Sequence, residues 1–123
     1  MSEAVLAYIN KTLTDAGINY EFGEWNSDIV YPYFVGEYSE SPPSEEDGSI
    51  EATFMLNGFT IGKWLDLENA KNKIEKLFTF NTSILDNGSG VDISYAGGLI
   101  IPTGDATLKR IQINLSIKEW RVI

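Results

Sequence analysis

The hydrophobic pattern of residues 50–80 constrains the fold more than any other feature of this chain. In its first part, apolar and polar or mixed positions alternate, as in a strand with one buried face. The apolar positions there are Ile50, Ala52, Phe54 and Leu56. Apolar residues then recur at helical spacing, at Leu67, Ala70, Ile74, Leu77 and Phe78. The stretch therefore predicts a strand followed by an amphipathic helix over 65–78 that needs a sheet to pack against.

The boundaries of these two elements rest on local signals. Asn57-Gly58 is a strong two-residue hairpin signal. Only three residues separate it from Gly62, too few for a second arm, so we expect one long strand that is kinked or bulged at Gly58. Asp66 is expected to cap the helix that follows.

A second helix is predicted over residues 3–16. Ser2 is a suitable N-cap, and Gly17 followed by an apolar residue indicates a Schellman-type stop. Its predicted buried face holds Val5, Leu6, Ile9, Leu13 and Ala16.

The remaining segments supply strands. Short strands are expected over 18–25 and 29–38, and Pro32 marks a strand end or an edge because it cannot donate to a ladder. Residues 81–90 are turn-rich, and a strand follows over 91–96 until Gly97-Gly98 interrupts it. The chain closes with a long antiparallel strand over 108–122. Its alternation changes phase after Ile117, which predicts a bulge or a second apolar contact.

Composition excludes several classes of protein. The 123 residues, 43% of them hydrophobic, suffice for one domain spanning 1–123. The chain has no cysteine and no histidine, so it lacks disulfides, thiolate ligands and the commonest general base. Its net charge of −9 disfavours binding to a phosphate backbone. Because no apolar run approaches a bilayer-spanning length, we expect a soluble protein that is made in the cytoplasm.

The stretch 39–49 is the clearest loop. It has no hydrophobic residue, two prolines and four acidic side chains. The favoured interpretation is a solvated hairpin tip, and the alternative is an arm that orders when a partner docks. The candidate interaction residues are Glu40, Pro42, Pro43, Glu45, Glu46 and Asp47.

The sequence contains no signature of catalysis. Without histidine the hydroxyl residues cannot form a catalytic triad. The acids at 45–47 and the segment 86–90 are better explained as solvated charge and a turn than as metal sites. We therefore expect no catalytic, cofactor or metal site and no enzyme. Trp25, Trp64 and Trp120 lie near predicted element ends, where an exposed indole would suit a protein interface.

The order of elements and several strings resemble one protein family over nearly the whole chain. These strings are the pair Tyr31-Pro32 that leads into a strand, GFTIGKWLDLENAKNKIEKLF at 58–78 and IPTGDATLKRIQINLSIKEW at 101–120. The sequence resembles the tail terminators, also called tail completion or minor tail proteins, of long-tailed bacteriophages and Gram-positive prophages.

This resemblance implies an α+β fold with a mostly antiparallel sheet and two helices packed on one face. It also implies a ring, commonly a hexamer, that caps the tail tube, ends its polymerisation and forms part of the head-tail joint. The implied partners are further copies of the chain, the tail tube protein and the head connector protein, with DNA only as passing cargo. The implied location is the virion tail or neck, and the net charge of −9 suits a channel through which DNA slides.

Other functions remain open at this point. The chain could be another neck or head-completion protein of the same particle. It could also be an acidic DNA mimic that inhibits a host nuclease, which would need carboxylates at phosphate-like spacing. A small enzyme or ligand-binding domain would need a concave pocket with converging polar groups and is the weakest alternative.

Overall fold

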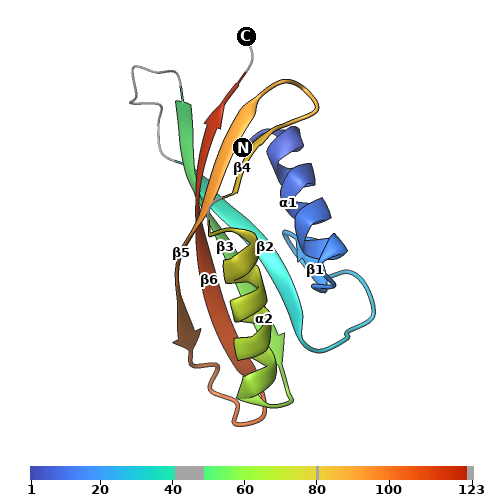
Figure 1. Ribbon diagram of the computed structural model, residues 1–123. Coiled ribbons are helices and arrows are strands. Elements are labelled where there is room, and N and C mark those ends of the chain that lie inside the picture. The colour runs from blue at the N-terminus through green and yellow to red at the C-terminus, as the bar shows by residue number, and fades with distance from the viewer. Residues whose placement is uncertain (41–48, 80, 122–123) are drawn as a thin grey trace.

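The computed structural model describes residues 1–40, 49–79 and 81–121. In order along the chain (Figure 1), the elements are α1 (Glu3–Asp15), β1 (Tyr20–Phe22), β2 (Tyr33–Glu40), β3 (Ser49–Thr60), α2 (Trp64–Leu77), β4 (Asn81–Ile84), β5 (Gly90–Ile101) and β6 (Lys109–Trp120). The N-terminus and the last residues of β6 before Arg121 lie toward the same end of the molecule (Figure 1). We call the opposite end, where β3 ends and α2 begins, the distal end.

The six strands form one twisted sheet in the order β1-β2-β3-β6-β5-β4. Only the short β1 runs parallel to its neighbour, and all other pairs are antiparallel. Residues of the first half of the chain therefore form one flank of the sheet, and residues of the second half form the other. This arrangement confirms the predicted α+β fold with a mostly antiparallel sheet.

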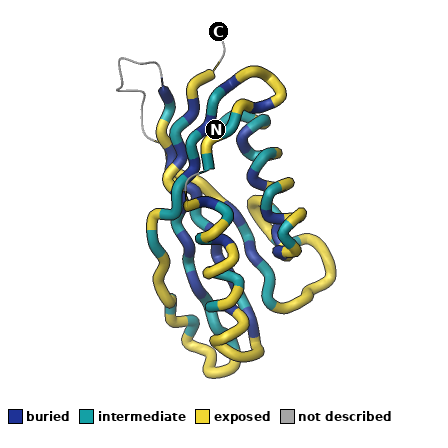
Figure 2. The backbone as a smooth tube through the Cα atoms, in the orientation of Figure 1, coloured by how far each residue is buried: buried dark blue, intermediate teal, exposed yellow. Residues whose placement is uncertain are grey.

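Both helices cover the same face of the sheet, as predicted (Figure 1). Buried residues alternate along the central strands (Figure 2), and facing pairs such as Phe54 and Leu115 lie in register across β3 and β6. One contiguous core cluster joins these strands to both helices. The helical members of the cluster are Val5, Ile9, Leu13, Leu67 and Ile74. The helical stripe and the strand alternation thus bury against each other, as their periods require.

The helix ends follow the expected capping chemistry. The Ser2 hydroxyl accepts a hydrogen bond from the Val5 N–H at 3.3 Å. At the other end of α1, Gly17 adopts a φ of 82°, and the Ile18 N–H donates to the Leu13 carbonyl, completing a Schellman motif. Neither helix of the described part of the chain combines the length and hydrophobicity needed to cross a bilayer.

The cap of α2 differs from the prediction. Lys63 occupies the N-cap position, and Asp66 lies inside the first turn. The Asp66 carboxylate nevertheless accepts a hydrogen bond from the Lys63 N–H at 3.2 Å. Asp66 is therefore not the N-cap but the third helical residue, and from there its side chain pairs with the otherwise free N–H of the N-cap residue Lys63.

The expected single strand through Asn57-Gly58 is confirmed, but its kink is not. β3 pairs continuously with β2 and β6 on its two sides, without a register shift. The glycine is explained by packing, because a Cβ at Gly58 would lie 2.3 Å from a ring carbon of Phe34. Asn57-Gly58 therefore does not form a hairpin turn, because β3 pairs with both neighbouring strands there and Gly58 makes room for the Phe34 ring.

The second half of the sheet departs from the prediction in three places. Residues 81–84, expected to be part of a turn, form the edge strand β4. β5 does not stop at Gly97-Gly98 but absorbs a register shift between Tyr95 and Gly98 and continues to Ile101. Of the two alternatives predicted after Ile117, the bulge is absent: the buried carboxylate Glu119 takes the next inward position of β6, and Trp120 is 36% exposed.

Candidate functional site

The shifted pKa values of two ionisable groups are explained by their immediate surroundings. Among the described residues, no group of three or more acidic side chains is placed to hold a metal ion. Hydrogen bonds from Thr107 lower the pKa of Asp105, which stabilises the loop between β5 and β6. Burial raises the pKa of the Tyr20 hydroxyl on the helix-covered face. Each of these shifts has a local structural cause.

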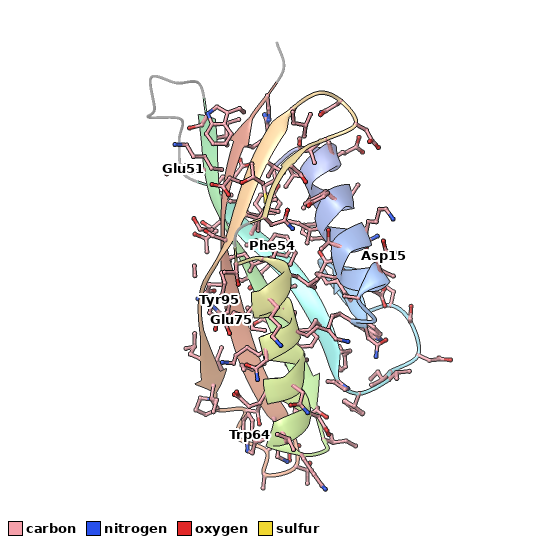
Figure 3. The ribbon with its side chains drawn as sticks, in the orientation of Figure 1. Asp15, Glu51, Phe54, Trp64, Glu75 and Tyr95 are labelled. Atoms are coloured by element: carbon pink, nitrogen blue, oxygen red, sulfur yellow. The ribbon has the colours of Figure 1, made fainter. Side chains whose placement is uncertain are left out.

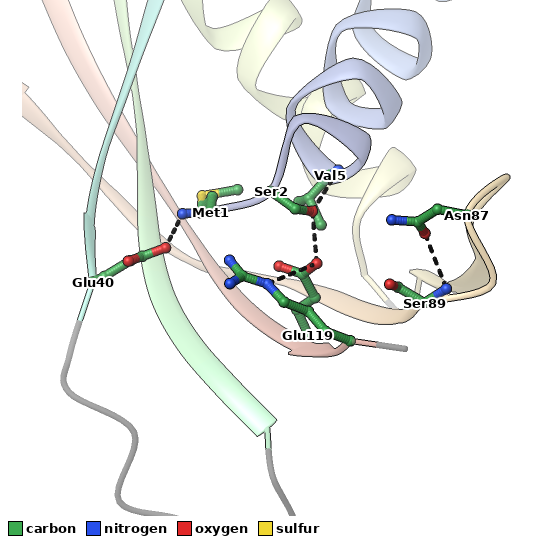
Figure 4. Close-up of polar contacts among 8 residues, drawn as sticks. Met1, Ser2, Val5, Glu40, Asn87, Ser89 and Glu119 are labelled. Atoms are coloured by element: carbon green, nitrogen blue, oxygen red, sulfur yellow. Dashed lines mark hydrogen bonds and ion pairs between the residues drawn. The ribbon is translucent and has the colours of Figure 1, made fainter. Parts of the chain in front are cut away.

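The end of the sheet near the termini holds a polar cluster (Figure 4). The Ser2 hydroxyl donates to a Glu119 carboxylate oxygen at 2.6 Å, and the Arg121 Nε lies 3.5 Å from the same oxygen. Glu119 is 1% exposed, so these contacts offset the cost of burying its charge. The cluster ties the start of α1 to the end of β6 and has a structural role.

The predicted interaction loop begins in this region. The carboxylate of Glu40, the last residue of β2, forms an ion pair with the N-terminal amine of Met1 (Figure 4). The other candidates, Pro42, Pro43, Glu45, Glu46 and Asp47, lie outside the described residues. Their role in binding a partner stays a prediction.

The three candidate interface tryptophans lie in three different places. Trp25 is in the β1–β2 loop, with its ring centroid 4.9 Å from that of Tyr33. Trp64 begins α2 at the distal end (Figure 3), and Trp120 ends β6, where the Lys118 Nζ lies 5.2 Å from its ring centroid. The fold therefore does not gather them into one site, and each must be considered with its own surroundings.

Trp25 belongs to an aromatic row on the face of the sheet that the helices leave open. The ring centroids of Tyr33 and Phe59 lie 5.2 Å apart, and the Arg110 guanidinium carbon lies 5.6 Å from the Phe59 centroid. Arg110 also donates to the Asn57 side chain at 2.8 Å. Aromatic and arginine side chains that are partly exposed together are typical of protein interfaces.

Sequence reasoning missed this row. The available signal was that Phe59 stands at an odd-numbered position of β3, opposite in parity to the buried Phe54 and Leu56. The strand register then places Tyr33 and Arg110 on either side of Phe59, which no local pattern could show.

Trp64 borders a shallow hollow of about 370 Å³ at the distal end. Ile100 at the end of β5, the β5–β6 loop and Lys109 form the rest of its lining. The lining is mainly apolar, and its polar side chains are Thr103, Asp105 and Lys109. Thr103 and Asp105 are engaged in hydrogen bonds within the β5–β6 loop, so the hollow fits a protein side chain better than a small polar ligand.

Charge is divided unevenly between the two flanks of the sheet. Residues 12–62, which include β1, β2 and β3, contain ten acidic residues and no lysine or arginine. Residues 63–121, which form α2 and the other three strands, contain seven acidic and eight basic residues. Along the sequence, the net charge of −9 is therefore concentrated in residues 12–62, which include three acids outside the described residues.

Comparisons with known proteins support a shared fold. No family model and no curated protein matches this sequence. A solved structure without a descriptive name aligns over 100% of this chain and 99% of its own, with 15% identity and a TM-score of 0.73. A chain of the virion of a native gene transfer agent particle aligns over 94% of this chain and 91% of its own, with 11% identity and a TM-score of 0.68.

Proposed function

We propose that this protein is a structural component of a phage-like particle and serves as its tail terminator. The observation that carries the proposal is the likeness of fold, over 94% of this chain, to a chain of a gene transfer agent virion. The order of elements and the strings at 58–78 and 101–120 support the same assignment independently, through their resemblance to tail terminators.

The proposed work is mechanical and involves no catalysis. Copies of the chain form a ring on the finished tail tube, end its polymerisation and present a surface to the head connector. The partners are thus the chain itself, the tube protein and the connector protein, and the location is the virion tail or neck. The excess of acidic residues keeps DNA from adhering as it passes through the ring.

Two other functions predict different results. Another neck or head-completion role would place the same fold at a different level of the particle. The ten acidic residues of 12–62 also favour a DNA mimic that occupies a basic nuclease site. A DNA mimic would be dispensable for particle assembly, whereas a terminator would not.

Deletion of the gene from the phage or prophage that carries it tests the proposal. Electron microscopy of the particles is expected to show unjoined heads together with overlong or irregular tails. Heads that lack a neck but accompany normal tails would instead indicate a head-completion role. Normal infectious particles would falsify the structural role altogether.

A further inference from the structure

We propose that copies of this chain associate head to tail through two different patches on opposite sides of the distal end. The β2-side patch consists of the apolar residues Ile29, Val30 and Tyr31 with the acids Glu24 and Asp28. The β5-side patch consists of the apolar residues Trp64, Leu65, Leu99 and Ile100 with the bases Lys63 and Lys109. The β2-side patch of one copy packs against the β5-side patch of the next. This inference rests on the proposed ring and specifies which surfaces form it.

The strand register places the two patches at the same level of the sheet. Ile100 pairs with Ile111, Ile111 lies opposite Gly58, and Gly58 lies opposite Phe34. This row crosses the four strands from the β5-side patch to the start of β2, immediately after the β2-side patch. Two copies standing side by side can therefore bring one patch of each into contact.

Each patch groups several exposed apolar side chains. Val30 is 57% exposed and Ile100 is 58% exposed, and the other apolar members of both patches are exposed as well. Grouped apolar side chains with charges beside them mark interaction surfaces.

The β2-side patch is held in place by side-chain hydrogen bonds. The Asn19 amide donates to the carbonyls of Val30 and Pro32, at 3.4 and 3.2 Å. The Trp25 indole N–H donates to the Asp28 carbonyl at 3.4 Å. A patch that is ordered before contact loses less entropy when a partner docks.

The β5-side patch includes an open strand edge. β4 pairs with β5 only as far as Ile93, and the Tyr95 N–H donates to the Phe78 carbonyl. From Leu99 to Ile101, no strand among the described residues pairs with the outer edge of β5. An open apolar edge of this kind is a place where another chain can add backbone and side-chain contacts.

The β2-side patch carries only acidic charge, whereas the β5-side patch carries two lysines beside the carboxylates of Asp66 and Asp105, and this difference in charge favours a second copy as the occupant. Glu24 and Asp28 come from the flank that has no base, whereas Lys63 and Lys109 form no ion pair within the described residues. The carboxylate of Asp105 accepts two hydrogen bonds from Thr107, which hold it within the β5–β6 loop but leave its negative charge in place. Opposite local charges orient two molecules that otherwise repel each other.

Because the two patches differ, the contact is heterologous. A heterologous contact repeats from copy to copy and closes into a ring when the rotation permits. The same chain thus supplies both halves of every interface.

Cysteine cross-linking tests this contact directly, since the natural chain has no cysteine. The test chain carries Val30→Cys and Ile100→Cys and is treated with a short bifunctional maleimide, both as purified protein at high concentration and in assembled particles. A covalent ladder that ends in one closed species is expected. The matched control combines Ile100→Cys with Ile84→Cys, whose side chain is 81% exposed on β4 and lies outside both patches.

The single variants establish the direction of the contact. Each of Val30→Cys and Ile100→Cys alone is expected to stay monomeric, and their mixture is expected to stop at dimers. Three results would overturn the proposed contact. They are dimers formed by one single variant alone, a ladder from the Ile84→Cys control equal to that of the test chain, and the absence of a ladder from both the purified protein and the particles. A ring seen by microscopy without the ladder would leave the proposed function intact, and a ladder with normal particles after gene deletion would refute the function alone.

Discussion

The two faces of the central strand β3 differ sharply, and the difference separates stability from recognition. On the helix-covered face, Ala52, Phe54 and Leu56 are buried. On the open face, Glu51 and Thr53 are exposed. The covered face supplies the apolar burial that stabilises the domain, because that burial is the dominant favourable term in folding. The open face contributes less to this burial, because more of its side chains remain exposed.

The open face is not simply polar. Tyr33 and Phe59 stack there, and Arg110 joins them while it donates to Asn57. These side chains keep part of their surface exposed, so their removal affects folding less than removal of a covered residue. The two faces can therefore be distinguished by substitutions at neighbouring positions.

The largest effect is expected at Phe54. Phe54→Ala should lower the free energy of unfolding by about 3–5 kcal/mol, because the ring is fully buried and its removal leaves a cavity. Met55→Ala, one position away on the open face, should cost less than about 1.5 kcal/mol. Urea unfolding measures both values, and equal losses would contradict the assignment of faces.

The next largest effect is expected on α2. Ile74→Ala should cost about 2–5 kcal/mol, since Ile74 is fully buried against the sheet. Asn72→Ala, at an exposed position of the same helix, should change stability by less than about 0.5 kcal/mol. Lys73 would be a poorer control, because its Nζ donates to the Ala16 carbonyl at 2.8 Å. Indistinguishable unfolding midpoints for the Ile74 and Asn72 variants would show that α2 packs differently.

A smaller effect is expected from adding one methyl group to the covered face. Gly58→Ala should cost about 1–3 kcal/mol, because the new Cβ would overlap the Phe34 ring. Gly90→Ala is the control, since its Cβ would meet the nearest side-chain atom at an ordinary 3.8 Å. Thermal unfolding of both variants checks the prediction, and a Gly58 variant as stable as the Gly90 variant would place Phe34 elsewhere.

The covered face was predicted well from the sequence, because the spacing of apolar residues indicates which face of a strand or helix is buried. Burial alternates strictly along β6 from Ile111 and along much of β3, and the end of α1 at Gly17 follows from a local backbone requirement. Asn57-Gly58 shows the limit of such local signals, because its meaning depends on a Phe34 ring that is distant in sequence. β4 was missed for a similar reason, since a short edge strand needs only one partner and little apolar surface.

The candidate interaction surfaces were predictable only in part. The position of Trp64 near an element end was predicted, but its neighbour Ile100 belongs to a strand segment that was predicted to have ended. The row of Trp25, Tyr33 and Phe59 depends on strand register, which local patterns do not determine. A surface built from several strands thus requires the fold before it can be recognised.

The smallest effect at neutral pH is expected at Tyr20, the one covered-face residue whose hydroxyl tests burial directly. That hydroxyl has no hydrogen-bond partner among the described residues, so Tyr20→Phe should leave stability unchanged or raise it by up to about 1 kcal/mol.

Burial raises the pKa of Tyr20, so the folded protein keeps this proton at a pH where the unfolded chain loses it. Stability should therefore fall as pH rises above about 10, the usual tyrosine value, and Tyr20→Phe should reduce this fall. Tyr38→Phe, which removes a hydroxyl at an exposed position of β2, is the matched control. Urea unfolding as a function of pH measures the slopes. A loss of more than about 1 kcal/mol for Tyr20→Phe at neutral pH would mean that the hydroxyl is bound, and the covered face would then contain a polar contact that its apolar pattern does not indicate.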